Sequence, residues 1–597
     1  MPSARLVTIL PNLIRITSSA LVSGNAASVR FISTNRIQGN TAATAESKLS
    51  NSDKYLHYSN DEGYYKTSPF ESIESINIPL DKYVWRDFKK WENTVAAICI
   101  ITGRQYTFAE LRDASAAFAV RLQTKFKLGK NDVLAICLPN LPEYPIAALG
   151  AIEAGLTVTT VNPIYTAEEI ARQLNFSDAK FVVGISSNYD IIKDACKRAQ
   201  KDIPIACIRM RPAEDLPAGA IDFFELIKTS EVDYSLLKNY NVKGSDMVFL
   251  PFSSGTTGLP KGVMLTHNNI TANCEQIQRP LTIDARGKTV PAILPFFHIY
   301  GLTVIMLSKL GEGAKLVTMP QFKPEDLMKS LFEYKASILN LVPPIALFMI
   351  NHPKVTRETA PELEFVMSGA APIGISDVER FIKKFPNTKF LQGFGMTESS
   401  PVVLLTPETN TRYASTGFLT GSTEAKIVAL DGTDAKGMGP NSTGELCVRG
   451  PQVMSGYLNN EEATRDTFYP NGWLRTGDVA HFDDDGYFYI TDRMKELIKV
   501  KGFQVPPAEL EAILRDHPKI TEAAVFGIPH DLNGEAPRAL VTLKPGCEAT
   551  EQEIYDYIAE RVAVYKKLEG GVIFAQEIPK NPTGKILRKV LKEKYSS

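Results

Sequence analysis

Metal-binding and disulfide patterns are absent from this sequence. Its seven cysteines lie far apart and form no C-x-x-C pair, and its seven histidines show no metal-ligand spacing. Several cysteines stand in apolar runs such as "VLAICLP". The pattern argues against a zinc site and a disulfide framework, and it indicates buried free thiols in a reducing compartment. The cysteines are Cys99, Cys137, Cys196, Cys207, Cys274, Cys447 and Cys547.

Long apolar runs and an excess of one charge are also missing. No window of eighteen residues is uninterruptedly apolar, so we predict no transmembrane helix. Lys plus Arg is 66 and Asp plus Glu is 67. Because these charges nearly cancel, no overall field favours nucleic acid or an acidic membrane surface as a partner. An anionic ligand must therefore be bound by local groups.

The first 45 positions contain no acidic residue, and the first acidic residue of the chain is Glu46. The same segment is rich in Ser, Thr and Ala, which is typical of a mitochondrial transit peptide when arginines accompany them. Pro11 would break the apolar core of a secretory signal. We therefore expect residues 1–45 to direct import into mitochondria, with a disordered cytoplasmic extension as the alternative. The arginines are Arg5, Arg15, Arg30 and Arg36.

The rest of the chain predicts an α/β fold with several lobes. Helical spacing over residues 107–126 and 142–155 alternates with strand patterns over 132–139 and 157–163. Strands that alternate with helices favour parallel sheets covered on both faces. The segment "DMVFLPFSS" reads as one further buried strand.

Short strand patterns between turns dominate after about residue 410, which predicts a β-rich lobe. Helices are expected again over 506–518, where Pro507 suits the first helical position, and over 551–565. We predict a large N-terminal α/β domain that includes the β-rich lobe, followed by a small mobile α+β domain. The strand patterns cover residues 424–430, 444–450, 486–492 and 523–529.

The loop "SSGTTGLPKG", Ser253–Gly262, is rich in glycine and hydroxyls and contains Lys261. It is not a Walker loop, because Pro260 occupies the second glycine position and Gly262 replaces the hydroxyl residue that binds Mg²⁺. Backbone N–H groups and hydroxyls of such a loop can still bind a phosphate. An ordinary glycine-rich turn is the alternative.

Three further motifs carry chemically useful side chains. "LQGFGMTESSP" contains Thr397 and Glu398, a hydroxyl and a carboxylate suited to phosphate and Mg²⁺. "GWLRTGD" ends on Asp478, which suits ribose hydroxyls, and Arg493 follows fifteen residues later. "NPTGKILRK" contains Lys585. Each motif taken singly has an alternative interpretation. Glu398 would be a solvated loop acid, Asp478 a turn-forming residue and Lys585 a surface lysine.

These motifs, with "DRMKELIKVKGFQVPPAELE", resemble in order and spacing those of the adenylate-forming superfamily of acyl-CoA synthetases, adenylation domains and beetle luciferases. The likeness covers about residue 70 to the C-terminus. "FFHIYG" and "GGVIFAQEIPKNPTGKILRK" most resemble the 4-coumarate–CoA ligase and luciferase branch. The resemblance implies an ATP-dependent, AMP-forming acid–CoA ligase. Such enzymes form an acyl-adenylate with release of pyrophosphate, and coenzyme A then displaces AMP.

The resemblance also implies roles for individual residues. Thr397 would contact the α-phosphate, Glu398 would hold Mg²⁺, and Lys585 would bridge the attacking carboxylate and the α-phosphate. Asp478 and Arg493 would bind the ribose. The loop residues implied to bind the β- and γ-phosphates are Ser253, Ser254, Gly255, Thr256, Thr257, Gly258 and Lys261. Those implied to line the nucleotide are Ser368, Gly369, Ala370, Ala371, Gln392, Gly393, Phe394, Gly395 and Met396.

In this family one site serves both half-reactions, because the C-terminal domain rotates about a hinge that corresponds to Lys495 here. The implied domains are 46–494 and 495–597. Rotation would replace Lys585 with a coenzyme A face formed by Lys499, Gly502 and Gln504. His298 matches the family's gate between the acyl pocket and the thiol channel, with a purely structural histidine as the alternative.

The implied acyl pocket is apolar and suits an aryl acid or a medium- to long-chain aliphatic acid. None of its residues is basic, which disfavours a dicarboxylate. A luciferase-like oxygenase, a carrier-protein adenylating enzyme and an inactive binding protein are the alternatives. Gly421–Ser422 and Pro506 depart from the family pattern, at positions outside the implied chemical residues. The pocket residues are Tyr300, Val304, Pro401, Val402 and Val403.

Overall fold

The structure is a computed structural model that describes residues 52–595 except 75–76, 212, 231, 239, 254–259, 280–282, 433, 502, 531 and 582–583. The predicted transit peptide, residues 1–45, lies outside the described residues. The described part belongs to one compact unit of the chain, Ala45–Ser597. Within it, mixed α/β architecture confirms the predicted fold class.

A largely parallel sheet forms first, in the order β11-β12-β10-β6-β5-β7-β8-β9. Its central strands are buried on both faces, as parallel strands between helical layers are. Helix α3 (Phe108–Thr124) begins at a capping box between Thr107 and Glu110 and packs against α4 (Glu143–Glu153), as the helical spacing predicts. The strands are β5 (Val133–Ile136), β6 (Thr157–Thr160), β7 (Ala179–Ile185), β8 (Ile205–Ile208), β9 (Ile221–Asp222), β10 (Met247–Phe249), β11 (Phe252–Ser253) and β12 (Lys261–Thr266).

The single strand predicted over "DMVFLPFSS" is wrong, because the structure divides it into β10 and β11. Pro251 lies between them and has no N–H to donate to a ladder. The Leu250 N–H still donates to the Val158 carbonyl at 2.9 Å, so the segment that contains β10 stays hydrogen-bonded to β6 as far as Leu250.

Two more sheets follow, in the orders β13-β14-β3-β4 and β15-β16-β17-β18-β19. The second is parallel from β15 to β17 and antiparallel from β17 to β19. Its strands are β15 (Ile338–Leu341), β16 (Phe365–Ser368), β17 (Lys389–Gly395), β18 (Val402–Leu405) and β19 (Phe418–Leu419). The other strands are β3 (Val95–Cys99), β4 (Gln105–Thr107), β13 (Thr289–Ala292) and β14 (Lys315–Thr318).

The helices around these sheets include α11 and α12, which pack together. Lys384, in the last turn of α12, donates to three carbonyls where α11 ends: those of Met349, Ile350 and His352. The helices are α2 (Leu80–Trp85), α5 (Ala167–Ser177), α6 (Tyr189–Arg198), α7 (Phe223–Ile227), α8 (His267–Gln278), α9 (Ser308–Gly311), α10 (Pro324–Phe332), α11 (Pro343–Asn351) and α12 (Ile375–Lys384).

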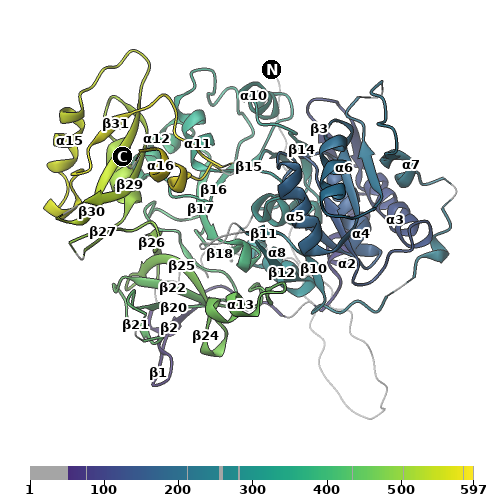
Figure 1. The fold of residues 1–597 in the computed structure, drawn as a ribbon, viewed down its shortest axis with the longest axis horizontal. Coiled ribbons are helices and arrows are strands. Elements are labelled where there is room, and N and C mark those ends of the chain that lie inside the picture. Colours follow the sequence, from purple (N-terminus) through teal and green to yellow (C-terminus); the bar gives the residue numbers. More distant parts are fainter. Residues whose placement is uncertain are drawn as a thin grey trace, which may run out of the picture. The chain divides into compact units, whose positions relative to one another are not determined.

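A mainly antiparallel sheet forms the predicted β-rich lobe, in the order β1-β2-β21-β20-β22-β25-β24 with β26 on β25. Figure 1 shows the N-terminal strands β1 and β2, in purple, in one sheet with the green strands β20–β22, which come much later in the chain. The sequence patterns did not predict that pairing. The strands are β1 (Leu56–Ser59), β2 (Gly63–Thr67), β20 (Glu424–Val428), β21 (Gly437–Met438), β22 (Gly444–Arg449), β24 (Phe468–Tyr469), β25 (Trp473–Phe482) and β26 (Phe488–Arg493).

The C-terminal residues build a last sheet, β28-β27-β30-β29 with β31 on β30. One core cluster joins it to α14 and α15, and another joins it to α16; both clusters draw their buried members from residues after 497. The predicted boundary at residue 495 stays a prediction. The elements are β27 (Ile498–Val500), β28 (Phe503–Val505), α14 (Pro507–Arg515), β29 (Ile520–His530), β30 (Gly534–Leu543), α15 (Glu551–Ala559), β31 (Val572–Phe574) and α16 (Arg588–Tyr595).

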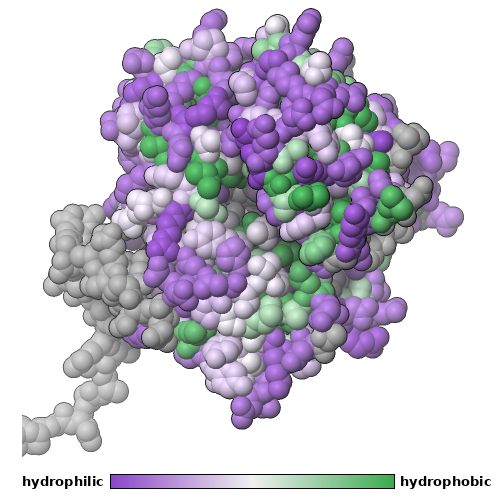
Figure 2. Space-filling view, turned by 90° about the vertical axis from the view of Figure 1, so that its left-hand side faces the viewer, coloured by the Kyte–Doolittle hydropathy of each residue, from purple (hydrophilic) through white to green (hydrophobic). Residues whose placement is uncertain are grey.

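All seven cysteines are free thiols, and all but Cys547 are buried. Burial raises the pKa of the Cys196 thiol to about 11 and that of Cys137 to about 12. Among the described residues, no helix is both long and apolar enough to cross a membrane. Figure 2, which faces the side of the β-rich and C-terminal elements, shows a largely hydrophilic surface with apolar side chains between the polar ones.

Candidate active site

The two strands that flank the glycine-rich loop form a short antiparallel pair at the edge of the first sheet. Strands β11 and β12 pair so that Ser253 lies opposite Lys261. Five predicted phosphate-binding residues of the loop lie outside the described residues: Ser254, Gly255, Thr256, Thr257 and Gly258. The described base of the loop thus places one hydroxyl and one ammonium side by side at its opening.

Glu398 lies directly beside this strand pair, in a 3₁₀ turn (Thr397–Ser399) that follows β17. Its side chain is buried, and its Oε1 accepts hydrogen bonds from the Ser253 hydroxyl and the Tyr457 hydroxyl, both at 2.9 Å. Both of these bonds go to the same carboxylate oxygen, Oε1. A buried carboxylate with hydroxyl neighbours is a donor set that suits Mg²⁺. Thr397, beside it, is partly buried.

Tyr457 is a site residue that sequence reasoning missed. It belongs to β23 (Gly456–Tyr457), which pairs with β12 and brings the phenol across from a distant part of the chain. Its ring also lies under the Lys261 ammonium, with Nζ 4.9 Å from the ring centroid. Burial and the Glu398 carboxylate raise the pKa of Tyr457, so the phenol stays a hydrogen-bond donor. No local motif around "SGYL" indicates this contact.

Asp478 and Arg493 face each other across β25 and β26. Arg493 Nε lies 3.0 Å from Asp478 Oδ1. Asp478 is 2% exposed, and its Oδ2 has no hydrogen-bond partner among the described residues. Burial raises the pKa of this carboxyl to about 6, against the lowering effect of Arg493 and Lys585. A buried acceptor without a donor is costly unless a ligand supplies one.

Lys585 reaches the same place from the C-terminal residues. Its Nζ lies 3.8 Å from Glu496 Oε1, and burial together with the nearby Arg493 lowers its pKa, while Glu496 and Asp478 raise it. Its backbone is fixed by Asn581, whose Oδ1 accepts the Lys585 N–H at 2.9 Å. Glu496 is a second residue that the sequence patterns did not indicate.

The predicted hinge residue, Lys495, adds another cation to this region. Burial and the neighbouring charges of Lys261 and Arg493 lower its pKa. Four basic side chains therefore converge around the site: Lys261, Arg493, Lys495 and Lys585. Such a cluster of like charges favours binding of a polyanion.

The predicted nucleotide-lining residues lie at the ends of β16 and β17. Ser368 is paired with Gln392 in register, so both side chains lie on one face of the sheet. Ala370 has a positive φ of 67°, which is strained for a residue with a side chain. The Gln392 amide donates to the Tyr413 carbonyl at 2.6 Å, so it fixes a loop in this structure. The intervening residues Gly393, Phe394, Gly395 and Met396 are partly exposed.

His298 and Tyr300 lie at the start of a π-helix (Tyr300–Leu307). Burial lowers the pKa of His298 to about 4, so its imidazole is neutral at physiological pH. The Tyr300 hydroxyl donates to the Met367 carbonyl at 3.1 Å, which ties the π-helix to β16 next to Gly369. The other predicted acyl-pocket residues, Val304, Pro401, Val402 and Val403, are buried. π-Helices occur often at functional sites.

The predicted coenzyme A face lies on the hairpin of β27 and β28. Lys499 is paired with Gln504, and both side chains are exposed. The Lys499 N–H donates to Glu535 at 2.8 Å, within the same C-terminal sheet. Gly502 lies outside the described residues. The structure thus brings Lys585, and not Lys499, into the electrostatic neighbourhood of Asp478.

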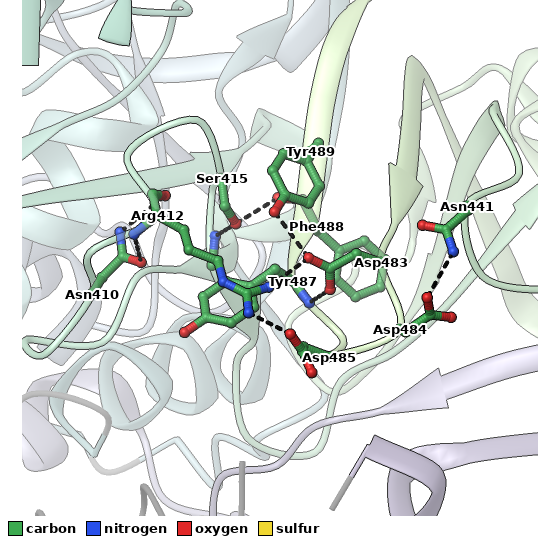
Figure 3. A network of polar contacts seen from close by, with 11 residues as sticks. Asn410, Arg412, Ser415, Asn441, Asp483, Asp484, Asp485, Tyr487, Phe488 and Tyr489 are labelled. Atoms are coloured by element: carbon green, nitrogen blue, oxygen red, sulfur yellow. Dashed lines mark hydrogen bonds and ion pairs between the residues drawn. The ribbon is translucent and has the colours of Figure 1, made fainter. Parts of the chain in front are cut away.

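A network of polar contacts fixes the far end of the β25–β26 hairpin (Figure 3). Arg412 forms ion pairs with Asp483 and Asp485 in the turn, and its guanidinium lies 4.4 Å from the Tyr487 ring centroid. The Ser415 hydroxyl donates to the Phe488 carbonyl at 2.9 Å. Because the loop containing Arg412 also accepts the Gln392 amide, the strands that carry Gln392, Asp478 and Arg493 are held together.

Comparison with known proteins identifies the family. A family model described as "AMP-binding enzyme" matches residues 84–458, and one described as "AMP-binding enzyme C-terminal domain" matches residues 509–585. The chain belongs to the AMP-binding enzyme family. Similar relatives include 4-coumarate–CoA ligase 3 of Oryza sativa subsp. japonica, 39% identical over 85% of this chain and 91% of that protein. 4-Coumarate–CoA ligase 1 of Arabidopsis thaliana is 36% identical over 87% of this chain and 93% of that protein.

Solved structures share the fold. The o-succinylbenzoate CoA synthetase of Bacillus subtilis, in complex with its acyl-adenylate, matches with a TM-score of 0.73 and 26% identity, over 86% of this chain and 98% of that one. ATP-bound MatB of Rhodopseudomonas palustris matches in fold, with a TM-score of 0.79 and 24% identity over 87% and 99%.

These findings confirm the predicted class, an AMP-forming acid–CoA ligase that uses ATP, coenzyme A and Mg²⁺. The roles of individual residues stay predictions.

Proposed function

We propose that this protein activates a hydrophobic monocarboxylic acid as its acyl-adenylate and then transfers the acyl group to coenzyme A. The observation that carries the proposal is the buried Asp478 carboxylate, whose Oδ2 has no donor among the described residues, while the cations Arg493 and Lys585 lie close enough to act on it. An adenosine 5′-phosphate meets both needs, because its ribose hydroxyls donate hydrogen bonds and its phosphates neutralise cations. This supports a nucleotide at this position with its ribose on Asp478 and Arg493.

In the first half-reaction, the substrate carboxylate attacks the α-phosphorus and pyrophosphate leaves. Lys585 would stabilise the negative charge that builds between carboxylate and α-phosphate, and Thr397 would donate to a phosphate oxygen. Ser253 and Lys261 would hold the leaving pyrophosphate. Glu398 would hold Mg²⁺, which when bound would supply positive charge against the phosphates.

In the second half-reaction, the thiol of coenzyme A attacks the acyl carbonyl and AMP leaves. Lys585 would then have to withdraw, and the face of Lys499, Gly502 and Gln504 would replace it by rotation about Lys495. The exposure of Lys499 and Gln504 supports this role, because both side chains are available for a new partner. His298 stays neutral and would line the path of the thiol.

The substrate class rests on the apolar character of Tyr300, Val304 and residues 401–403, which include no cation that could pair with a second carboxylate. Benzoate and 4-coumarate ligases among the similar proteins support an aryl or other hydrophobic acid. A single methylene changes binding by only about 1–3 kcal/mol, so a panel of acids must vary shape as well as length.

The test is ATP–pyrophosphate exchange and thioester formation over a panel of aryl acids, fatty acids of graded length and dicarboxylates. We expect exchange and thioester with one hydrophobic class and neither with dicarboxylates. Exchange without thioester would favour a carrier-protein adenylating enzyme. Light emission with oxygen would favour the luciferase-like alternative, and no exchange with any acid would favour a binding protein.

We also propose that residues 1–45 direct the protein into mitochondria, on the evidence of their arginines and missing acids. A reporter fused after residue 45 should be imported, and a variant with the four arginines changed to glutamine should stay in the cytoplasm. A full-length cytoplasmic protein in fractionated cells would contradict this proposal.

A further inference from the structure

Helix α14 (Pro507–Arg515) is held at both ends by side chains that precede the predicted hinge. At its first turn, the Ala508 N–H donates to Asp492 Oδ2 at 2.9 Å. At its last turn, Arg515 Nε lies 3.9 Å from Asp377 Oδ2. Asp516, the next residue, accepts a hydrogen bond from the Ser376 hydroxyl. These contacts join the C-terminal residues to β26 and to the first turn of α12.

The contacts have the chemistry of a specific docking surface. A carboxylate at a helix N-terminus and a guanidinium at a C-terminus both complement the helix dipole. Asp377 is 5% exposed and Asp492 is 7% exposed, so water screens these interactions less than it does at an open surface. Asp377 also pairs with Arg380 at 3.1 Å, which fixes its carboxylate within α12.

A second set of contacts transmits the position of α14 to Lys585. Glu511, on α14, accepts a hydrogen bond from the Arg588 guanidinium at 2.6 Å. Arg588 also donates to the Val525 carbonyl at 3.1 Å and forms an ion pair with Glu496. Since Arg588 is three residues from Lys585, the place of α14 fixes the segment that carries this lysine.

Gly584, the residue before Lys585, lies against the start of α11. A Cβ added to Gly584 would lie 3.2 Å from Pro344 Cγ, at the start of α11. The segment therefore packs against residues before the hinge, next to α12. The position of Lys585 depends on how α14 docks on α12 and β26.

We propose that Ser376, Asp377 and Asp492 form a docking clamp for α14 that holds Lys585 in its adenylate-forming position and must release before the thioester step. They are positioning residues, because they act through α14 and Arg588 and not on substrate. The proposal rests on the two-step function proposed above.

The clamp is tested with Asp377→Asn, Arg515→Gln and the double variant, each assayed in the two half-reactions separately. We expect each single variant to form acyl-adenylate about threefold to tenfold more slowly, because fewer molecules hold Lys585 in place. The double variant should be no slower than the single variants, because both substitutions remove the same Asp377–Arg515 ion pair. Thioester formation from supplied acyl-adenylate should be unchanged or faster.

Asp194→Asn is the matched control, because Asp194 pairs with Arg198 at 2.9 Å on the exposed face of α6. It should leave both half-reactions unchanged. An equal loss of both half-reactions in Asp377→Asn and Arg515→Gln, no loss in either, or additive losses in the double variant would overturn the clamp.

Hydrogen exchange separates failure of the clamp from failure of the proposed function. Amides in the first turn of α12 and the last turn of α14 should exchange several-fold faster in Asp377→Asn than in Asp194→Asn, whatever the catalytic activity. Unaltered exchange would overturn the clamp. If the unmodified protein formed no acyl-adenylate, the proposed function would be refuted. If Asp377→Asn still showed the faster exchange in that case, the clamp would be retained.

Discussion

The environment of Asp478 predicts a pH dependence for both stability and ligand binding. Burial raises its pKa to about 6, which is above the value of about 3.9 for an aspartate in an unfolded chain. The folded state therefore binds the proton more tightly, and this group's contribution to stability is full below about pH 4 and is lost as pH rises through 6. Ligand binding has the opposite need, because only the carboxylate can accept two hydrogen bonds from ribose hydroxyls.

We therefore predict that the apparent KM for ATP rises as pH falls, by roughly tenfold between pH 7 and pH 5 for a group with this pKa. The nucleotide's own phosphate titrates in the same range, so Asp478→Asn is the control. That variant should bind ATP more weakly at pH 7 and lose the part of the pH dependence that belongs to the protein. Parallel pH profiles in the two proteins would contradict the assignment of Asp478 to the ribose.

Lys585 provides a second prediction about a single side chain. Lys585→Ala should slow acyl-adenylate formation by about 100-fold or more, because a fixed cation no longer meets the charge of the transition state. Thioester formation from supplied acyl-adenylate should stay within about twofold. Lys589→Ala is the control, since that side chain is 90% exposed on α16.

The mirror variant is Lys499→Ala, which should leave pyrophosphate exchange nearly intact and slow coenzyme A transfer. Rates of the two half-reactions, measured separately for each variant, would show the opposite selectivities. If both lysine variants lost the same half-reaction, the two-face assignment would be wrong.

Among the elements, the π-helix at Tyr300–Leu307 depends on one glycine. A Cβ on Gly301 would lie 2.1 Å from the Pro295 carbonyl oxygen, which accepts the His298 N–H at 3.1 Å. The missing side chain lets the turn that carries His298 pack directly on the helix. Larger residues in such a place force backbone shifts.

We predict that Gly301→Ala lowers the free energy of unfolding by about 1–3 kcal/mol and slows thioester formation, because His298 moves with the turn. Urea denaturation and the two half-reactions would measure both effects. Gly439→Ala is the control, since its Cβ would meet only Tyr64 ring atoms at 3.8 Å. Equal stability of the two variants would show that the 295–298 turn adapts without cost.

The elements that the sequence predicted well are those whose signals are local. Pro507 at the first position of α14 and the alternation of α3, β5, α4 and β6 follow from neighbouring residues alone. Helix α15 was predicted to residue 565 but ends at Ala559. The run after it includes Val562 and Val564, whose branched side chains disfavour a helix.

The parts that the sequence did not predict depend on residues far apart in the chain. Tyr457 contacts Glu398 and Lys261 only because β23 pairs with β12, and β1 joins a sheet built mainly from strands after residue 423. No periodic pattern or motif in the sequence predicts either of these strand pairings. The candidate site's own side chains were predicted through family motifs, while their supporting residues required the fold.

Across the whole molecule, the proposed two-step function requires the C-terminal residues to change position, and the predicted hinge for that change is Lys495. The neighbours of this residue are anchored on opposite sides. The Met494 N–H donates to the Gly477 carbonyl at 2.9 Å, next to Asp478, whereas Glu496 pairs with Arg588 and Lys585. A rotation that keeps both anchors must therefore change the backbone angles between them.

We predict that Lys495→Pro stalls the enzyme after the first half-reaction with acyl-AMP bound. Proline fixes φ near −65° and also restricts Met494, so the chain loses the freedom to exchange the Lys585 face for the Lys499 face. Lys495→Ala is the control, because it removes the charge near Lys261 and Arg493 but keeps the backbone free. Any loss shared by both variants belongs to that charge. Single-turnover assays with labelled ATP should show adenylate formation in both, and thioester formation that falls by orders of magnitude only in Lys495→Pro. Normal thioester synthesis by the proline variant would remove Lys495 from the hinge, and the axis of rotation would then have to lie elsewhere between Met494 and Ile498.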